Sequence, residues 1–156
     1  LDNLLSSADI KSHDSIDDAD RGKEMLNESI FNNLWLKDYY GEAEEKLLDI
    51  IRQSGKFGWF EQASYVSAIT LSNLRIWDTA KLRLLIRLFS DTTIHVSERA
   101  LTGIVLSLYY YDDRINLFPE ILEMIRGLSS KPGFADQCRN HLGYQVIHTF
   151  YLLSRL

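Results

Sequence analysis

Cysteine is nearly absent from this sequence. The single cysteine among 156 residues cannot form an internal disulfide, and no Cys/His spacing typical of a zinc site surrounds it. A hydrophobic core can be stable without disulfides or a metal site, because a chain of this length buries about 68 to 70% of its unfolded surface. We therefore expect a stable fold in a reducing compartment, the cytoplasm.

Long apolar runs and an excess of basic residues are also missing. The longest mostly apolar stretch, residues 101–111, is shorter than the ~20 residues needed to span a bilayer. The amino end lacks the basic, apolar and small-residue order of a signal peptide. The formal net charge of -5 disfavours a protein whose main role is to neutralise phosphates. We expect neither a membrane nor a nucleic acid as partner.

The negative charge is unevenly distributed along the chain. Residues 1–49 carry a net charge of -8, whereas residues 50–156 carry a net charge of +3. This positive excess is too small for a nucleic-acid footprint. It leaves open that the acidic segment folds back onto the rest of the chain, or that the rest prefers acidic protein partners.

Only two prolines and eight glycines interrupt the sequence, and apolar residues recur between them at spacings of three and four. This is the helical period, so we predict an all-α protein. Residues 1–20 are the exception, because they are acidic and poor in bulky apolar groups, and we expect a poorly ordered or loosely helical lead-in. Residues 21–156 are predicted to form one domain with helical hairpins at about 21–54, 58–90 and 94–129 and a final long helix at 134–155.

An internal repeat connects these hairpins. Residues 59–63 align with residues 96–100 at a shift of 37, and these align with residues 134–138 at a shift of 38. Each block has the order apolar, any, acidic, polar, small. Repeats of this length stack so that neighbours complete each other's core. We predict a right-handed α-α superhelix, an α-solenoid, of about three and a half stacked hairpins.

The run from Leu84 to Arg114 resembles a HEAT-type repeat. It has a short helix ending near Asp91, a turn, and a second helix that opens with the acid-Arg-Ala step of residues 98–100. It is also similar to the helical parts of bacterial proteins described as tetratricopeptide-like, although the 34-residue signature is not met. The resemblance implies an α-solenoid that works by binding, and it carries no catalytic residues over.

The second, long helix of each repeat predicts a recognition surface. On a helical wheel the apolar arc of residues 94–111 includes Ile94, and the opposite face includes His95, Glu98, Arg99, Thr102 and Tyr109, with Tyr110 at its border. The repeat places Glu61, Gln62, Tyr65 and Ser72 on the equivalent face, with Tyr144 close to it on the last helix. We predict a mixed polar stripe with exposed Tyr65, Tyr109 and Tyr144, residues that suit protein recognition. The alternative is that these rings lie back over the core.

Two other groups of residues are candidate sites. Arg83 and Arg87, with Lys81 nearby, form either an anion-binding pair or an ordinary strip that is ion-paired to neighbours. Cys138, His141 and His148 lie on the last helix, but His148 is about 10 Å along the axis from His141, so one ion cannot bridge all three. Cys138 also takes the small-residue position of the repeat, which favours a buried apolar role. Gly103, inside a predicted helix, indicates a close helix contact.

No sequence signature of an enzyme or of a bound cofactor is present. We therefore predict a non-enzymatic, protein-binding or peptide-binding scaffold, and the absence of an initiator Met indicates a piece of a larger protein. The alternative is a packing or homodimerisation module that uses the nearly all-apolar last helix. A third hypothesis is a helical enzyme or a HEAT-like protein that processes nucleic acid.

Overall fold

The computed structural model describes residues 20–91, 93–130, 134–136 and 138–140, and these residues contain helices and no strand. The all-α prediction is therefore confirmed for the described part of the chain. A first helix covers residues 20–36. It is followed by α2 (Glu42–Ser54), α3 (Trp59–Arg75), α4 (Thr79–Asp91), α5 (Ile94–Tyr110), α6 (Asp112–Ile115) and α7 (Pro119–Ser129).

Local sequence explains where the helices begin and end. Gly55 ends α2 in the left-handed region at φ 62°, where a side chain would be strained. Asp78 caps α4, because its Oδ1 accepts the backbone N–H of Ala80 at 2.9 Å. Pro119 occupies the first turn of α7, where its missing N–H costs nothing.

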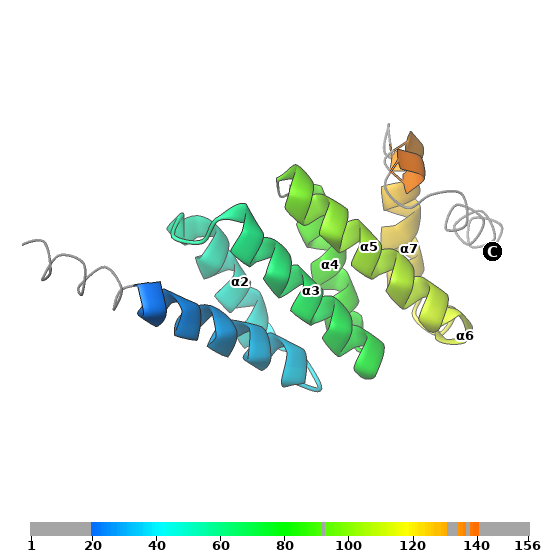
Figure 1. Ribbon diagram of the computed structural model, residues 1–156. Coiled ribbons are helices and arrows are strands. Elements are labelled where there is room, and N and C mark those ends of the chain that lie inside the picture. The colour runs from blue at the N-terminus through cyan, green and yellow to red at the C-terminus, as the bar shows by residue number, and fades with distance from the viewer. Residues whose placement is uncertain (1–19, 92, 131–133, 137, 141–156) are drawn as a thin grey trace, which may run out of the picture.

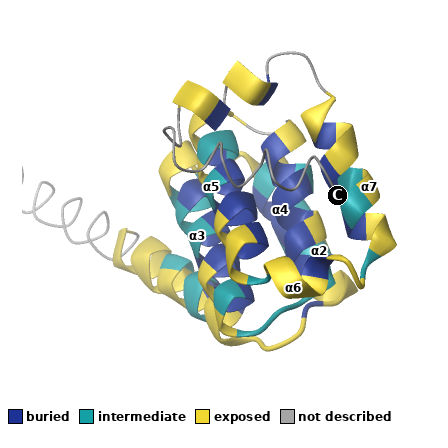
Figure 2. Ribbon diagram, turned by 90° about the vertical axis from the view of Figure 1, so that its right-hand side faces the viewer, coloured by how far each residue is buried: buried dark blue, intermediate teal, exposed yellow. Residues whose placement is uncertain are grey.

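The helices form two layers. Figure 1 shows the helix at residues 20–36, α3 and α5 side by side in front, with α2, α4 and α7 behind them, and Figure 2 shows the same two layers from the side. The three long front helices run in the same direction. Lys23 contacts Glu61 and Asn27 contacts Tyr65, and further on Asn73 contacts Ser107. The amino ends of the three helices therefore lie at one end of the molecule.

The core lies between the layers, where buried residues gather in Figure 2. Its centre is formed by α5 and the elements on either side of it, since α5 packs extensively against both α3 and α4. The front and back layers meet through aliphatic side chains with less than 2% exposure, including Leu34, Ile69, Leu82, Leu85, Leu101, Ile104, Leu108, Ile115 and Ile121. Burial of such side chains, at roughly 1.5–3 kcal/mol each, is the main force that holds the layers together.

Several predicted boundaries match the structure within two residues. Helices begin or end close to the ends of the predicted hairpins: the first helix begins at residue 20, α2 ends at Ser54, α3 begins at Trp59, α5 begins at Ile94 and α7 ends at Ser129. The short helix α6 was not predicted, because four residues are too few to show helical periodicity. Residues 134–136 and 138–140 are helical. The rest of the predicted final helix, and the lead-in before residue 20, lie outside the described residues.

Gly103 makes the close helix contact that the sequence indicated. A Cβ atom at this position would overlap Thr70 Oγ1 on α3 and would lie 3.3 Å from Leu85 Cδ1 on α4. Gly103 thus lets the backbone of α5 approach both neighbouring helices. Gly127, in contrast, has no such neighbour within 4 Å.

The two glycines predict opposite effects of the same substitution. Gly103→Ala should lower the free energy of unfolding by about 2–3 kcal/mol, because the added methyl group has no room. Gly127→Ala should raise it by about 0.5–1 kcal/mol, because alanine is the better helix former. Urea unfolding followed by circular dichroism measures both. Thr70→Ala should restore part of the stability lost in Gly103→Ala, and a tolerated Gly103→Ala would contradict the close contact.

Candidate functional site

The structure places Tyr65 inside the molecule, so its predicted exposure is wrong. Its side chain is only 1% exposed, and its hydroxyl donates a hydrogen bond of 2.5 Å to Asn27 Oδ1 on the first helix. The ring meets that of Phe57 edge-on at 5.9 Å between centroids. Burial raises the pKa of Tyr65 to about 12 from its ordinary value of 10.0.

The reason for this error lies in the direction of the predicted stripe. On α3 the stripe faces the preceding long helix and not solvent: Glu61 pairs with Lys23 at 2.8 Å, and the Ser72 hydroxyl donates to the carbonyl of Lys37 at 2.9 Å. Ser72 is fully buried. Polar residues on this face therefore hold two helices together, which corresponds to the alternative of rings lying over the core.

On α5 the equivalent face borders an open groove. The groove lies between the amino-terminal halves of α3 and α5 and has a volume of about 290 Å³. It contains two of the predicted partner-binding residues, Glu98 and Arg99. The complete lining is Trp59, Ala63, His95, Glu98, Arg99 and Thr102.

The groove is open because one large side chain is missing from the repeat. The shift of 37 makes Thr102 the equivalent of Tyr65. The Tyr65 ring fills the space between the first helix and α3, whereas Thr102 is short and faces Ala63 across the groove. The same packing position is thus filled in one helix pair and left open in the next.

Exposed aromatic side chains surround this groove. Trp59 is 53% exposed and Phe60 69% exposed, and Ile94 is 65% exposed at the start of α5. The Trp59 ring contacts the Phe60 ring at 5.9 Å and the His95 ring at 4.6 Å between centroids. We call Trp59, Phe60, Ile94, His95 and Arg99 the aromatic end. Their clustering joins large apolar area to a cation, a combination that suits recognition of a protein segment.

Sequence reasoning missed three members of the aromatic end, Trp59, Phe60 and Ile94. It placed Ile94 in the apolar arc of its helix, but the structure exposes Ile94 because that residue begins α5, beyond the partner helices. It gave Trp59 no role, although the repeat aligns Trp59 with Val96 and Phe134, which are 1% and 5% exposed. The sequence carries no signal of this exposure, because the alignment places Trp59 with two residues that are buried.

The remaining predicted tyrosines do not join this groove. Tyr109 is 69% exposed, as predicted, and Tyr110, predicted at the border of the polar face, is 66% exposed, but both lie at the opposite end of α5. Ten residues of helix separate Arg99 from Tyr109, about 15 Å along the axis. Tyr144 lies outside the described residues. The predicted polar stripe is therefore divided on α5, with Glu98 and Arg99 near its amino end and Tyr109 and Tyr110 at its carboxyl end.

The arginine strip on α4 follows the ion-paired interpretation. Arg87 lies 3.5 Å from Glu45 and 3.4 Å from Asp49, both on α2. Arg83 is exposed and lines a groove of about 510 Å³ between α2 and α4, together with Glu45, Leu84, Ile86, Arg87, Ser90 and Met124. The acidic residues beside Arg87 offset its charge, so this groove is a weak site for an anion.

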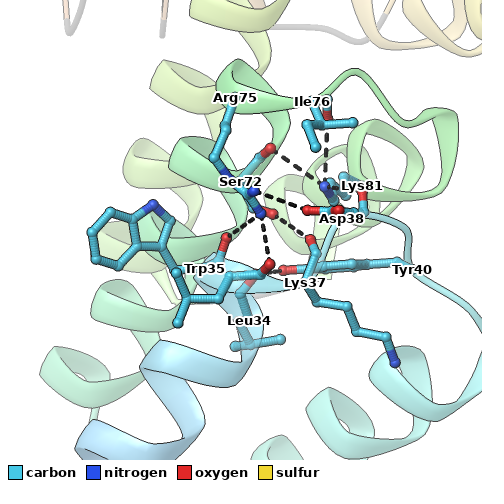
Figure 3. Close-up of polar contacts among 10 residues, drawn as sticks. Leu34, Trp35, Lys37, Asp38, Tyr40, Ser72, Arg75, Ile76 and Lys81 are labelled. Carbon is cyan, nitrogen blue, oxygen red and sulfur yellow. Dashed lines mark hydrogen bonds and ion pairs between the residues drawn. The ribbon is translucent and has the colours of Figure 1, made fainter.

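Lys81 is separated from these arginines and buried completely. Figure 3 shows its Nζ among backbone carbonyls: it donates to Asp38 at 2.7 Å, Ser72 at 3.3 Å and Ile76 at 3.4 Å. The ammonium group also lies 5.1 Å from the centre of the Tyr40 ring. Burial lowers the pKa of Lys81 below its ordinary value. The alternative in which Lys81 adds to an anion site with Arg83 and Arg87 is therefore not supported, because the Lys81 charge is used within the protein.

Further hydrogen bonds connect Lys81 to its surroundings. Arg75 pairs with Asp38 at 2.8 Å and donates to the carbonyl of Leu36 at 2.7 Å. The backbone N–H of Tyr40 donates to Asp78 Oδ2 at 2.7 Å. We call this set the polar junction: Asp38, Tyr40, Ser72, Arg75, Asp78 and Lys81.

The predicted Cys138 and histidine group can be followed only in part. Cys138 is 5% exposed, and burial raises the pKa of its thiol to about 11, so it is a poor nucleophile at neutral pH. His141 and His148 lie outside the described residues. Within the part of the chain that the structure describes, no three His, Cys, Asp or Glu side chains come together in a way that could hold a metal ion. In the same part, no helix is long and apolar enough to cross a bilayer.

Comparison with known proteins adds no family to this picture. No protein-family model, curated protein or solved structure matches the chain. The candidate site is therefore defined by its own geometry, the α3–α5 groove and the aromatic end.

The polar junction predicts a specific sensitivity at Lys81. Lys81→Met should lower the free energy of unfolding by about 2 kcal/mol, because the buried ammonium group no longer donates to the carbonyls of Asp38, Ser72 and Ile76. Lys46→Met is the matched control: Lys46 is 73% exposed and pairs with Glu42 within α2, so its change should stay within about 0.5 kcal/mol. Urea unfolding at pH 7 compares them. Equal stability of the two variants would contradict the junction.

The buried Tyr65 predicts a loss of stability at high pH. Its pKa is about 12 in the folded protein and about 10 when unfolded, so above pH 10 the unfolded chain releases the proton first. Between pH 9 and pH 11 this lowers the free energy of unfolding by about 1 kcal/mol. Tyr65→Phe should lack that part of the decrease, and Tyr109→Phe should keep it. Urea unfolding curves at pH 9 and pH 11 test this. An equal decrease in the free energy of unfolding for wild type and Tyr65→Phe would rule it out.

Proposed function

We propose that this chain is a non-enzymatic scaffold that binds a protein or peptide segment in the α3–α5 groove. The observation that carries the proposal is the aromatic end, where Trp59, Phe60 and His95 are in contact with one another beside an open groove. Trp59 and Phe60 remain largely exposed, and neither belongs to the buried core. Large aromatic side chains on rigid helices contribute contact area at a low cost in conformational entropy. No cofactor takes part in this function.

The proposed architecture is a HEAT-like or tetratricopeptide-like α-solenoid within a larger protein. Contacts between neighbouring long helices support it, because their sequence separations stay close to the repeat length: 38 residues for Tyr65 and Asn27, and 37 for Tyr111 and Leu74. Solenoids commonly use such a continuous layer of helices as a binding face. The cytoplasm remains the proposed location.

A packing or homodimerisation module is the second candidate. The apolar last helix that motivated it lies outside the described residues, but the opposite edge offers a related feature. On the first helix Met25 is 72% and Leu26 50% exposed, and no described helix covers them. In a solenoid such an edge is where a further repeat or a second copy stacks. Light scattering on the full chain distinguishes a dimer from a monomer.

Binding can be tested with peptides selected from a random displayed library against the full chain. Trp59→Ala should weaken the dissociation constant of selected peptides at least about tenfold, equivalent to about 1.4 kcal/mol. Thr102→Tyr should weaken binding similarly without removing any group, because the new ring fills the groove as Tyr65 fills its equivalent.

Trp35→Ala serves as the matched control. Trp35 is 39% exposed but lies in the last turn of the first helix, at the carboxyl end, away from the groove. Its removal should change the affinity less than twofold. The proposal fails if no peptide is enriched, or if both tryptophan variants lose affinity equally.

A further inference from the structure

We propose that residues 1–19 of this chain are an intramolecular ligand of the α3–α5 groove. This inference rests on the proposed function, because it assigns an occupant to the same groove. It follows from three properties of the described residues: where the chain leaves the first helix, which charges lie unpaired at the aromatic end, and how far the groove is from residue 20.

The chain leaves the first helix at the end of the molecule that carries the groove. Lys23, one turn after residue 20, pairs with Glu61 in the first turn of α3 at 2.8 Å. Trp59 precedes Glu61 by two residues and contacts His95 at the start of α5. Residue 20 and the aromatic end therefore lie at the same end of the front layer (Figure 1).

The charges of the two parts are complementary. Residues 1–19 contain five aspartates and one lysine, a net charge of -4. Arg99 is exposed and forms no ion pair within the described ranges, and Lys56, three residues before the start of α3, is also exposed and unpaired there. Glu61 is already neutralised by Lys23. His95 and Glu98 face each other across 3.9 Å, so the acidic side chain of the groove has a local partner.

The apolar side chains match as well. The segment carries Leu4, Leu5, Ile10 and Ile16 between its aspartates. Trp59 and Ile94 at the groove supply exposed apolar area against which such side chains can pack. Burial of one aliphatic side chain together with one charge-assisted contact is enough for an intramolecular ligand, because its effective concentration is millimolar.

The distance is well within reach. Neighbouring packed helices lie 8–10 Å apart, so the groove beyond α3 is about 20 Å from the first helix. An extended chain covers about 3.3 Å per residue, so roughly six residues bridge this gap. Asp14 is therefore within reach of the groove, and the segment that precedes it, including Asp9 and Ile10, is long enough to extend along it.

Paramagnetic broadening in the full chain tests this placement. A nitroxide on Ser7→Cys, in a Cys138→Ala background, is read by the indole N–H signals of the three tryptophans. Trp59 lines the groove, whereas Trp35 lies near the carboxyl end of the first helix and Trp77 follows the carboxyl end of α3. The tether alone places the label nearer to Trp59, so the decisive measurement is the change caused by Arg99→Glu.

We expect Arg99→Glu to increase the intensity of the Trp59 signal at least about threefold, and 0.5 M NaCl to act in the same direction because it screens charges. Arg83→Glu, an exposed arginine on α4 away from the groove, should leave Trp59 unchanged. Asp9→Lys with Asp14→Lys should restore broadening in Arg99→Glu. Unshifted Trp35 and Trp77 signals show that each variant is folded.

The inference is overturned if Arg99→Glu leaves the Trp59 signal unchanged, or if Arg83→Glu has the same effect. Its failure is distinguishable from failure of the proposed function. If selected peptides lose affinity in Trp59→Ala but the Trp59 signal does not change in Arg99→Glu, the binding function is upheld and residues 1–19 are not its occupant. Charge-dependent broadening without any selected peptide would uphold the intramolecular ligand alone.

Discussion

The buried ammonium group of Lys81 is the interaction on which the arrangement of the front layer depends. It contacts carbonyls from two places at once, the carboxyl end of α3 and the linker after the first helix. The last carbonyls of a helix have no partner within the helix, so a lysine from the next helix supplies donors where they are needed. A cation without a carboxylate partner is costly to bury, and the surrounding carbonyls and the Tyr40 ring offset that cost. The first helix, α3 and α4 are thereby fixed relative to one another at a single point.

The fixed position of these carboxyl ends also affects the candidate site, which lies at the amino ends of the same helices. With their carboxyl ends joined by Lys81 and Arg75, the first helix and α3 run side by side for their whole length, and Tyr65 closes the space between them. The pair α3 and α5 is held instead by the close approach at Gly103 and by the hydrogen bond from Asn73 to Ser107 at 2.9 Å. Because Thr102 leaves the amino-terminal half of that pair unfilled, the groove opens there while the rest of the interface stays tight.

The sequence was sufficient to predict helices but not to predict which helix face meets which neighbour. Helical periodicity predicted the helices, and their ends at Gly55, Asp78 and Pro119 follow from local signals in the sequence. The exposure of Tyr65 was predicted wrongly, because an amphipathic wheel separates polar from apolar faces and cannot tell solvent from a polar neighbouring helix. Lys81 was misplaced for a related reason: its carbonyl partners at Asp38 and Ser72 lie 43 and 9 residues away. Glu98 and Arg99 were correctly grouped on one face, while the groove beside them depends on Trp59, whose exposure no local pattern shows.

The common direction of the three long helices has an electrostatic consequence for association. Each amino terminus carries a partial positive charge, and three of them lie together at the end with Lys56, His95 and Arg99. Neither Gly58 nor Thr93, the residues preceding α3 and α5, caps its helix with a side-chain hydrogen bond. An acidic segment approaching this end is oriented by the field before any contact forms, so salt acts on its association rate more than on its residence time. The front layer thus attracts and orients an acidic segment electrostatically in addition to offering the surface that binds it.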